Sequence, residues 1–167
     1  LNSQQMSIFS VFTEINQSGN DGIFQNGASN SGKLIYLLDG PSRPALFDLQ
    51  TNALNLTGSV LFNNSSETVM FGMDYNFNGS TGVGNMFKNG GSSASSASTQ
   101  SGSYNCGGGL LNIGRYYWGV TQSQADYFDG FLGDFIYFDQ VLSASDRDIV
   151  HCYLSSKYNQ PLSTICP

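Results

Sequence analysis

Acidic side chains in the C-terminal third are the residues whose type and spacing could do chemistry. The stretch GFLGDFIYFDQVLSASDRD, residues 130–148, holds four aspartates, and a fifth directly precedes it (Asp129, Asp134, Asp139, Asp146 and Asp148). Paired carboxylates hydrolyse glycosides, and clustered carboxylates bind calcium. The stretch is therefore either an acidic site or a set of aspartates that shape turns and a helix end.

Hydrolytic chemistry lacks its usual parts in this chain. The two glutamates, Glu14 and Glu67, are isolated, and Asp126 and Asp129 stand three residues apart, on opposite sides of an extended chain. With one histidine and no G-x-S-x-G motif, a Ser-His-Asp hydrolase is not supported either. We predict no catalytic residues, and we expect His151 at the surface or boundary of a helix.

Calcium is the one cofactor that the residues suggest. Asp126 and Asp129 are the candidate ligands, and Asp39 and Asp74 are more distant ones, because calcium prefers six to eight oxygen ligands from loops. The alternative is that Asp129 and Asp134 bond backbone amides or an arginine at turns. Three cysteines without metal-ligand spacing, together with a single histidine, argue against a zinc site.

An aromatic run offers a different kind of site. In GRYYWG, residues 114–119, Tyr116, Tyr117 and the only tryptophan, Trp118, stand between glycines in a predicted loop. Aromatic rings stack on the apolar face of a pyranose, while Asn and Asp side chains hold its hydroxyls, so we predict a sugar platform here. The alternative is that Trp118 and one tyrosine cover the end of the core.

Composition limits the class of protein and its partners. The 167 residues fit one domain, and abundant aromatics and turn residues with only 11% charged residues favour strands. A net charge of −6 and six scattered basic residues argue against nucleic acid. No apolar run approaches about 20 residues, which argues against direct membrane insertion.

Hydrophobic patterns predict short strands and one helix. The clearest alternation, Val69 to Phe77, predicts a strand with one side on the core. Ser143 with Asp146 predicts the N-cap of a helix that ends before Pro161. We expect a central strand over 127–138 and a flexible Gly/Ser-rich loop over 89–109, with further extended segments over 7–15, 22–27, 33–39, 53–62 and 110–114.

Cysteines and sequons bear on the compartment. Cys152 with Cys166 is the preferred disulfide, because it would tie the tail to the last helix, and Cys106 with either of them is nearly as plausible. N-x-S/T sequons, which are compatible with a secreted glycoprotein, occur at Asn16, Asn55, Asn63, Asn64 and Asn78.

A longer pattern carries a family resemblance. YFDGFLGDFIYFDQVLSASDRDIVHCYLSSKY resembles the C-terminal signature of concanavalin A-like lectin/glucanase domains, in the laminin-G-like and pentraxin-like subgroup. LLNIGR (110–115) resembles a further strand of that family, and MFKNG (86–90) resembles one of its hairpins. The matching positions of the signature are Phe128, Gly130, Leu132, Asp134, Tyr137 or Phe138, Asp139, Leu142, Ser143, Asp146, Leu154, Lys157 and Tyr158.

The resemblance implies a fold, and it implies that the first strand or strands of that fold are missing. It implies an all-β, two-sheet antiparallel jelly roll with one short C-terminal helix, formed by residues 1–167 as a single domain that lacks its first strand or strands. The chain would then offer an open N-terminal edge to self-assembly or to strand complementation. Where the family's calcium ligands follow a strand, this chain has RYYWGV, so those ligands are not carried over.

The resemblance also implies a function. We expect an extracellular or cell-surface binding or adhesion module, non-catalytic, with a glycan or another extracellular protein as partner. One alternative is a structural or assembly subunit of a surface filament or a larger extracellular protein. The other alternative, a glycoside hydrolase, would need the E-x-D-x-E strand of the fold's glucanases, which this chain does not contain.

Overall fold

The structure of the chain is a computed structural model. It describes residues 5–14, 20–26, 34–39, 45–49, 54–57, 67–77, 81–99, 111–118, 124–163 and 165–166, some of the strands by their backbone alone. The elements are β1 (Gln5–Glu14), β2 (Asn20–Asn26), β3 (Leu34–Asp39), β4 (Ala45–Leu49), β5 (Leu54–Thr57), β6 (Thr68–Phe77), β7 (Thr81–Lys88), β8 (Gly91–Thr99), β9 (Leu111–Ile113), β10 (Arg115–Trp118), β11 (Gln124–Tyr127), β12 (Gly130–Phe138) and α1 (Ala144–Tyr158).

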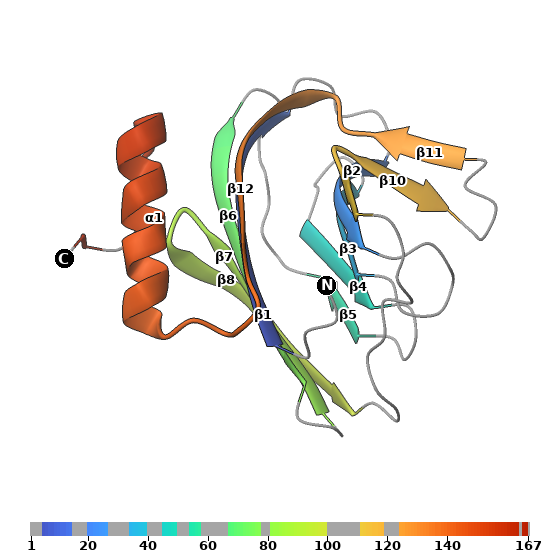
Figure 1. The fold of residues 1–167 in the computed structure, drawn as a ribbon, viewed down its shortest axis with the longest axis horizontal. Coiled ribbons are helices and arrows are strands. Elements are labelled where there is room, and N and C mark those ends of the chain that lie inside the picture. The colour runs from blue at the N-terminus through green and yellow to red at the C-terminus, as the bar shows by residue number, and fades with distance from the viewer. Residues whose placement is uncertain are drawn as a thin grey trace.

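Two five-stranded antiparallel sheets face each other, and α1 covers the outer face of one of them (Figure 1). The helix-covered sheet has the strand order β12-β1-β6-β7-β8, and the second sheet has the order β5-β4-β3-β2-β9. Strands β10 and β11 form a separate two-stranded ribbon. The predicted β-sandwich jelly roll with one short C-terminal helix is confirmed.

Strand β6 shows how the layers form. Val69, Phe71 and Met73 join the core between the sheets, as the alternating pattern predicts. The opposite face is buried as well: Met70 belongs to a second apolar cluster that α1 completes with Leu154. The helix-covered sheet is therefore packed on both faces.

Strand β1 lies inside the helix-covered sheet, second from its β12 end. It pairs with β12 on one side and with β6 on the other. The prediction of an open N-terminal edge is therefore wrong for this strand, because both of its edges are hydrogen-bonded. In the described part of the chain, β12 instead ends the sheet, which corrects the prediction of a central strand over 127–138.

Strand β8 corrects the prediction of a flexible loop over 89–109. Gly91–Thr99 form a nine-residue strand that pairs along β7, and Asn89 and Gly90 form the turn with φ of 49° and 81°. Two adjacent residues with positive φ are the geometry of a tight hairpin turn, for which Asn-Gly is the favoured sequence. Residues 100–109 lie outside the described residues.

Helix α1 confirms its predicted signals. The Ser143 hydroxyl accepts a hydrogen bond from the Asp146 N–H at 3.2 Å and donates to the Asp146 carboxylate at 2.6 Å. The helix ends at Asn159, whose φ of 51° is left-handed, before Pro161. No helix in the described ranges is long and apolar enough to span a bilayer.

Candidate functional site

The predicted sugar platform lies on the β10–β11 ribbon. The prediction of a loop is wrong for its aromatic residues, because Tyr116, Tyr117 and Trp118 belong to β10. In the antiparallel register Tyr116 pairs with Asp126 and Trp118 pairs with Gln124. The ribbon lies beside β2 of the second sheet, on the side of the molecule opposite α1 (Figure 1).

Hydrogen bonds hold the foot of the ribbon to the sandwich. Gly114, with φ of 75°, donates from its N–H to the Ile23 carbonyl of β2 at 2.9 Å and accepts from the Phe128 N–H at 2.9 Å. The positive φ favours glycine there. Arg115 donates from Nε to Oδ1 of the buried Asn112 at 3.1 Å. The first residues of β10 therefore start from a fixed point.

The structure brings the predicted sugar and metal residues into one region. The side chains of Tyr116, Tyr117, Trp118 and Asp126 lie outside the described residues, but their backbones share the ribbon. Asp129 is exposed in the connection from β11 to β12. Arg115 and the exposed Tyr127 pair across the foot of the ribbon, and sequence reasoning missed both.

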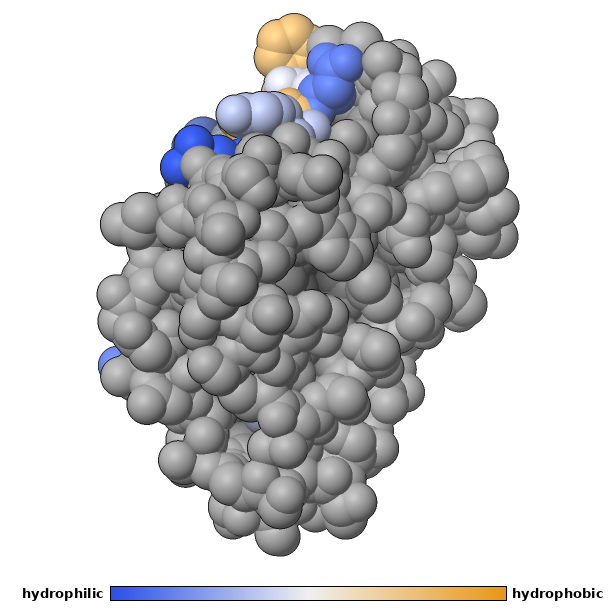
Figure 2. Space-filling view, turned by 90° about the vertical axis from the view of Figure 1, so that its right-hand side faces the viewer, coloured by the Kyte–Doolittle hydropathy of each residue, from blue (hydrophilic) through white to orange (hydrophobic). Residues whose placement is uncertain are grey.

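The signal for these two residues was available in the sequence. Tyr127 follows Asp126 by one residue, and Arg115 directly precedes the aromatic run. Their position opposite each other could be predicted only if the two short segments were known to pair as a ribbon. In Figure 2, hydrophilic and hydrophobic side chains lie next to one another at the upper rim of this side of the molecule.

Calcium has few described ligands. Asp129 is the one carboxylate of the predicted pair whose side chain is described, and the described residues contain no group of three or more metal-ligating side chains. Asp74 already accepts hydrogen bonds from Ser7 and Arg147, and Asp39 lies in β3 with its side chain outside the described residues. Described residues alone do not fit the ion, so the calcium site stays a prediction that depends on Asp126.

Several of the other aspartates have structural partners. The Asp146 carboxylate, in the first turn of α1, accepts from the hydroxyl of the N-cap Ser143 at 2.6 Å, and Asp134 forms an ion pair with Lys157, Oδ2 to Nζ at 2.8 Å. The hydrogen bond from Lys157 holds the pKa of Asp134 below its ordinary value, although burial acts in the opposite direction. These carboxylates are therefore engaged in the fold rather than in an acidic site.

His151 corrects a prediction. It was expected at the surface or boundary of the helix, yet it is 0% exposed and packs edge-on against Phe9, with ring centroids 5.3 Å apart. Neither of its ring nitrogens has a hydrogen-bond partner among the described residues. Burial lowers the pKa of His151 to about 4, so the buried ring is neutral at physiological pH.

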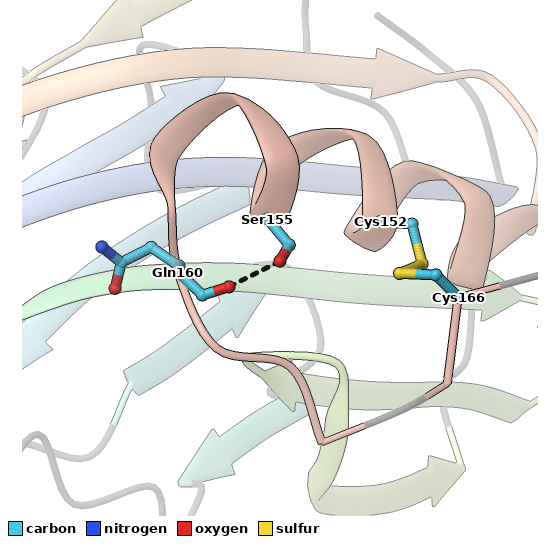
Figure 3. Close-up of a disulfide and its surroundings, with 4 residues drawn as sticks. All are labelled: Cys152, Ser155, Gln160 and Cys166. Carbon is cyan, nitrogen blue, oxygen red and sulfur yellow. Dashed lines mark hydrogen bonds between the residues drawn. A yellow bond between two sulfur atoms is a disulfide. The ribbon is translucent and has the colours of Figure 1, made fainter.

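The predicted disulfide and sequons have different outcomes. The structure contains the Cys152–Cys166 disulfide, which ties the C-terminal tail to the middle of α1, and Ser155 donates to the Gln160 carbonyl beside it (Figure 3). Cys106 lies outside the described residues. Asn55 lies in β5, its side chain not described, while Asn16, Asn63, Asn64 and Asn78 fall outside the described ranges.

Comparisons with known proteins show the fold. No protein-family model matches the chain, and no curated protein matches it by sequence. A heptameric SAP-like pentraxin from Limulus polyphemus is similar in structure, with a TM-score of 0.61 and 15% identity over 89% of this chain and 70% of that one.

Sialidase-associated structures are similar as well. The CBM40 domain of the Ruminococcus gnavus IT-sialidase, bound to α2,3 sialyllactose, has a TM-score of 0.60 and 10% identity over 86% of this chain and 80% of that one. The leech intramolecular trans-sialidase matches at a TM-score of 0.59 and 13% identity, over 87% of this chain and 22% of its own. At these identities the likeness shows the fold alone, an antiparallel β-sandwich jelly roll.

Proposed function

We propose that the chain is a non-catalytic carbohydrate-binding module of the laminin-G-like kind, which contacts glycans through the β10–β11 ribbon. The observation that carries the proposal is the ribbon itself, which pairs the aromatic strand Arg115–Trp118 with Gln124–Tyr127. Two of the similar structures support it, because a sialidase CBM40 of the same fold is bound to sialyllactose.

The residue types of the ribbon fit a sugar. Tyr116, Tyr117 and Trp118 supply aromatic rings for the apolar face of a pyranose, and Gln124 and Asp126 supply hydrogen-bonding groups for its hydroxyls. Because the hydrogen bonds of Gly114 hold the foot of the ribbon, the strand backbone is a steadier platform than a loop.

Other features support a binding role outside the cell. Asp74 and Asp134 are each engaged in an ion pair, which leaves them unsuited to act as a pair of hydrolytic carboxylates. The Cys152–Cys166 disulfide suits an oxidising compartment, such as the extracellular space or a cell surface.

A titration with glycans tests the proposal. Trp118 is the only tryptophan, so its fluorescence reports on the ribbon directly. The panel would contain α2,3- and α2,6-sialyllactose and neutral oligosaccharides. We expect at least one to change the emission, and calorimetry to show about tenfold weaker binding for Trp118→Ala.

The matched control is Tyr153→Ala, an exposed aromatic residue on α1, far from the ribbon (Figure 1). It should bind the same glycan as tightly as the wild type. Equal loss in both variants, or silence across the panel, would refute binding at the ribbon.

A second candidate is an assembly subunit that associates through β8. In the described part of the chain β8 pairs only with β7, and its sequence, GSSASSAST, holds no charge or proline to protect an edge. Sedimentation velocity over a concentration series tests this candidate. Concentration-dependent growth that Ala94→Pro and Ala97→Lys in β8 abolish would support it, and a constant monomer would rule it out.

Calcium at Asp126 and Asp129 is a separate proposal with its own measurement. We expect calcium to raise the melting temperature of the wild type and not that of Asp126→Asn. A melting temperature that neither calcium nor a chelator changes would contradict a structural ion.

A further inference from the structure

A groove of about 330 Å³ opens on the outer face of the helix-covered sheet, beside the last turn of α1. Its lining comes from three strands and the helix, and includes Val11, Thr13, Thr68, Phe131, Gly133 and Tyr158. The volume lies at the low end of about 300–1,000 Å³ typical of small-molecule sites, which suits one sugar ring.

A pair of hydroxyls gives the groove its polar part. Thr13 and Thr68 face each other across β1 and β6, and their Oγ1 atoms lie 2.7 Å apart. One hydroxyl donates to the other, so this bond uses one of the two protons. The second proton and the remaining lone pairs are then available to a ligand hydroxyl, since both residues are only partly buried.

Aromatic rings give the groove its apolar part. Phe131 is the cross-strand neighbour of Thr13 on β12, and 70% of it is exposed. Tyr158 lines the groove from the helix. An exposed phenyl ring beside a hydroxyl pair matches the two faces of a pyranose, one apolar and one rich in hydroxyls.

The groove is built into the fold by a β-bulge. The register between β1 and β12 shifts between Ser10 and Phe12, opposite Gly133 and Asp134. The Asp134 N–H donates to the Tyr158 hydroxyl at 2.8 Å, and a Cβ on Gly133 would lie 2.6 Å from that hydroxyl oxygen. Glycine at position 133 therefore lets Tyr158 approach the bulge.

The charges around the groove select a neutral ligand. None of its lining residues is charged. The neighbouring carboxylates are already paired, Asp134 with Lys157 at 2.8 Å and Glu67 with Lys88 at 3.1 Å. A charged ligand would be desolvated in this groove without an unpaired group of opposite charge to bind it. An uncharged polyol needs no such partner.

We propose that this groove is a binding subsite for a single neutral hexopyranose residue, which stacks on Phe131 and hydrogen-bonds to the hydroxyls of Thr13 and Thr68. The subsite is separate from the ribbon and does not depend on it. A module with both would contact a branched or extended glycan at two points.

Methyl NMR tests the subsite without relying on Trp118. The probes are the methyl glycosides of glucose, galactose and mannose, titrated into the full chain labelled at its Thr, Leu and Val methyl groups. We expect at least one glycoside to shift the methyl signals of Thr13, Thr68 and Leu132, with a Kd of roughly millimolar order, as few contacts allow no more.

Variants connect the signals to the groove. Phe131→Ala removes an exposed ring and should weaken binding by about three- to tenfold. Thr68→Val removes one hydroxyl at nearly constant shape and should also weaken it. The control is Ile149→Ala, which shortens an exposed apolar side chain on α1 that does not line the groove. It should leave the titration unchanged.

The outcomes separate this subsite from the ribbon. Groove shifts that persist in Trp118→Ala and weaken in Phe131→Ala support the inference, even if the ribbon binds nothing. Absence of groove shifts with all three glycosides overturns it. Equal shifts in the wild type, Phe131→Ala and Thr68→Val overturn it as well, and so do shifts confined to the ribbon.

Discussion

Two ion pairs fasten the two ends of α1 to the helix-covered sheet, and they differ in their surroundings. Near the N-terminal end, Arg147 contacts Asp74 of β6 at 2.6 Å, and the Asp74 side chain is 2% exposed. Near the C-terminal end, Lys157 contacts Asp134 of β12 at 2.8 Å, with side chains 44% and 26% exposed. The distances are similar, so the difference lies in burial.

The buried pair belongs to a network. Ser7 donates to the Asp74 carboxylate at 2.6 Å and accepts from the Leu142 N–H at 3.0 Å, which fixes the chain just before the helix. Arg147 also lies 4.3 Å above the Phe87 ring. Loss of one partner from such a network leaves the other charge buried and unsolvated. Loss of one partner from an exposed pair leaves a charge that water can solvate.

The largest effect is expected for Arg147→Met. The variant keeps the apolar stem but leaves the Asp74 carboxylate buried without its cation, so we expect the free energy of unfolding to fall by about 3–5 kcal/mol. Urea denaturation at pH 7 would measure the loss.

The double variant Asp74→Asn with Arg147→Met is its control. It removes both charges, so it should be more stable than Arg147→Met alone, as a double-mutant cycle would show. If the double variant is the less stable of the two, an unpaired charge is not what costs stability at this end of the helix.

Between the two ends, His151 makes α1 sensitive to acid. Its pKa is lowered by burial to about 4, against about 6.5 in an unfolded chain, and the nearby Arg147 lowers it further while Asp148 opposes this. The unfolded state therefore binds a proton first. The contribution of His151 to the free energy of unfolding is complete above pH 6.5. As the pH drops from 6.5 to 4, the free energy of unfolding should fall by about 3 kcal/mol.

Stability measured in urea at steps between pH 7 and pH 4 would test this, with His151→Leu as the control. Leucine has a similar size and no ring nitrogens to leave unpaired, so the variant should lose most of the pH dependence in that window. A slope that stays the same in His151→Leu would assign the acid sensitivity to other groups.

The ends of α1 also differ in how far the sequence predicted them. Local signals foretold the helix itself: Ser143 with Asp146 at the start, and helical spacing of apolar residues up to Tyr158. Asp134 and Lys157 were both positions of the family signature, and the structure joins them. Signals that act over a few residues, or that a known signature carries, could be predicted.

Partners distant in sequence could not be predicted. Asp74 and Arg147 are 73 residues apart, and no local pattern relates them. The burial of His151 depends on Gly72, because a Cβ at position 72 would lie 3.0 Å from the His151 Nε2 atom. It therefore depends on how α1 packs over β6. The ribbon likewise depends on the pairing of two four-residue strands.

Strand β8 was missed for a different reason. Its residues, Gly, Ser, Ala and Thr, carry no hydrophobic alternation, so composition suggested a flexible loop. The Asn89-Gly90 turn was the better signal, because it predicts a hairpin whatever the second strand contains. Backbone pairing with β7 defines this strand.

The smallest effect is expected for Lys157→Met at the exposed end. The hydrogen bond to Asp134 raises the pKa of Lys157, but the ammonium group is exposed to water, so the pair should contribute much less to the free energy of unfolding than the buried pair. The Tyr153 and Tyr158 rings lie 5.7 and 5.6 Å from Nζ, and methionine can keep contact with them. Urea denaturation at about 0.1 and 1 M salt would measure both the loss of stability and its screening by salt.

Because only the exposed one of these two pairs is accessible to salt ions, the stabilities of wild type and Lys157→Met should converge at high salt, while Arg147→Met stays destabilised. A loss from Lys157→Met as large as that from Arg147→Met would show that burial does not set the strength of these two pairs.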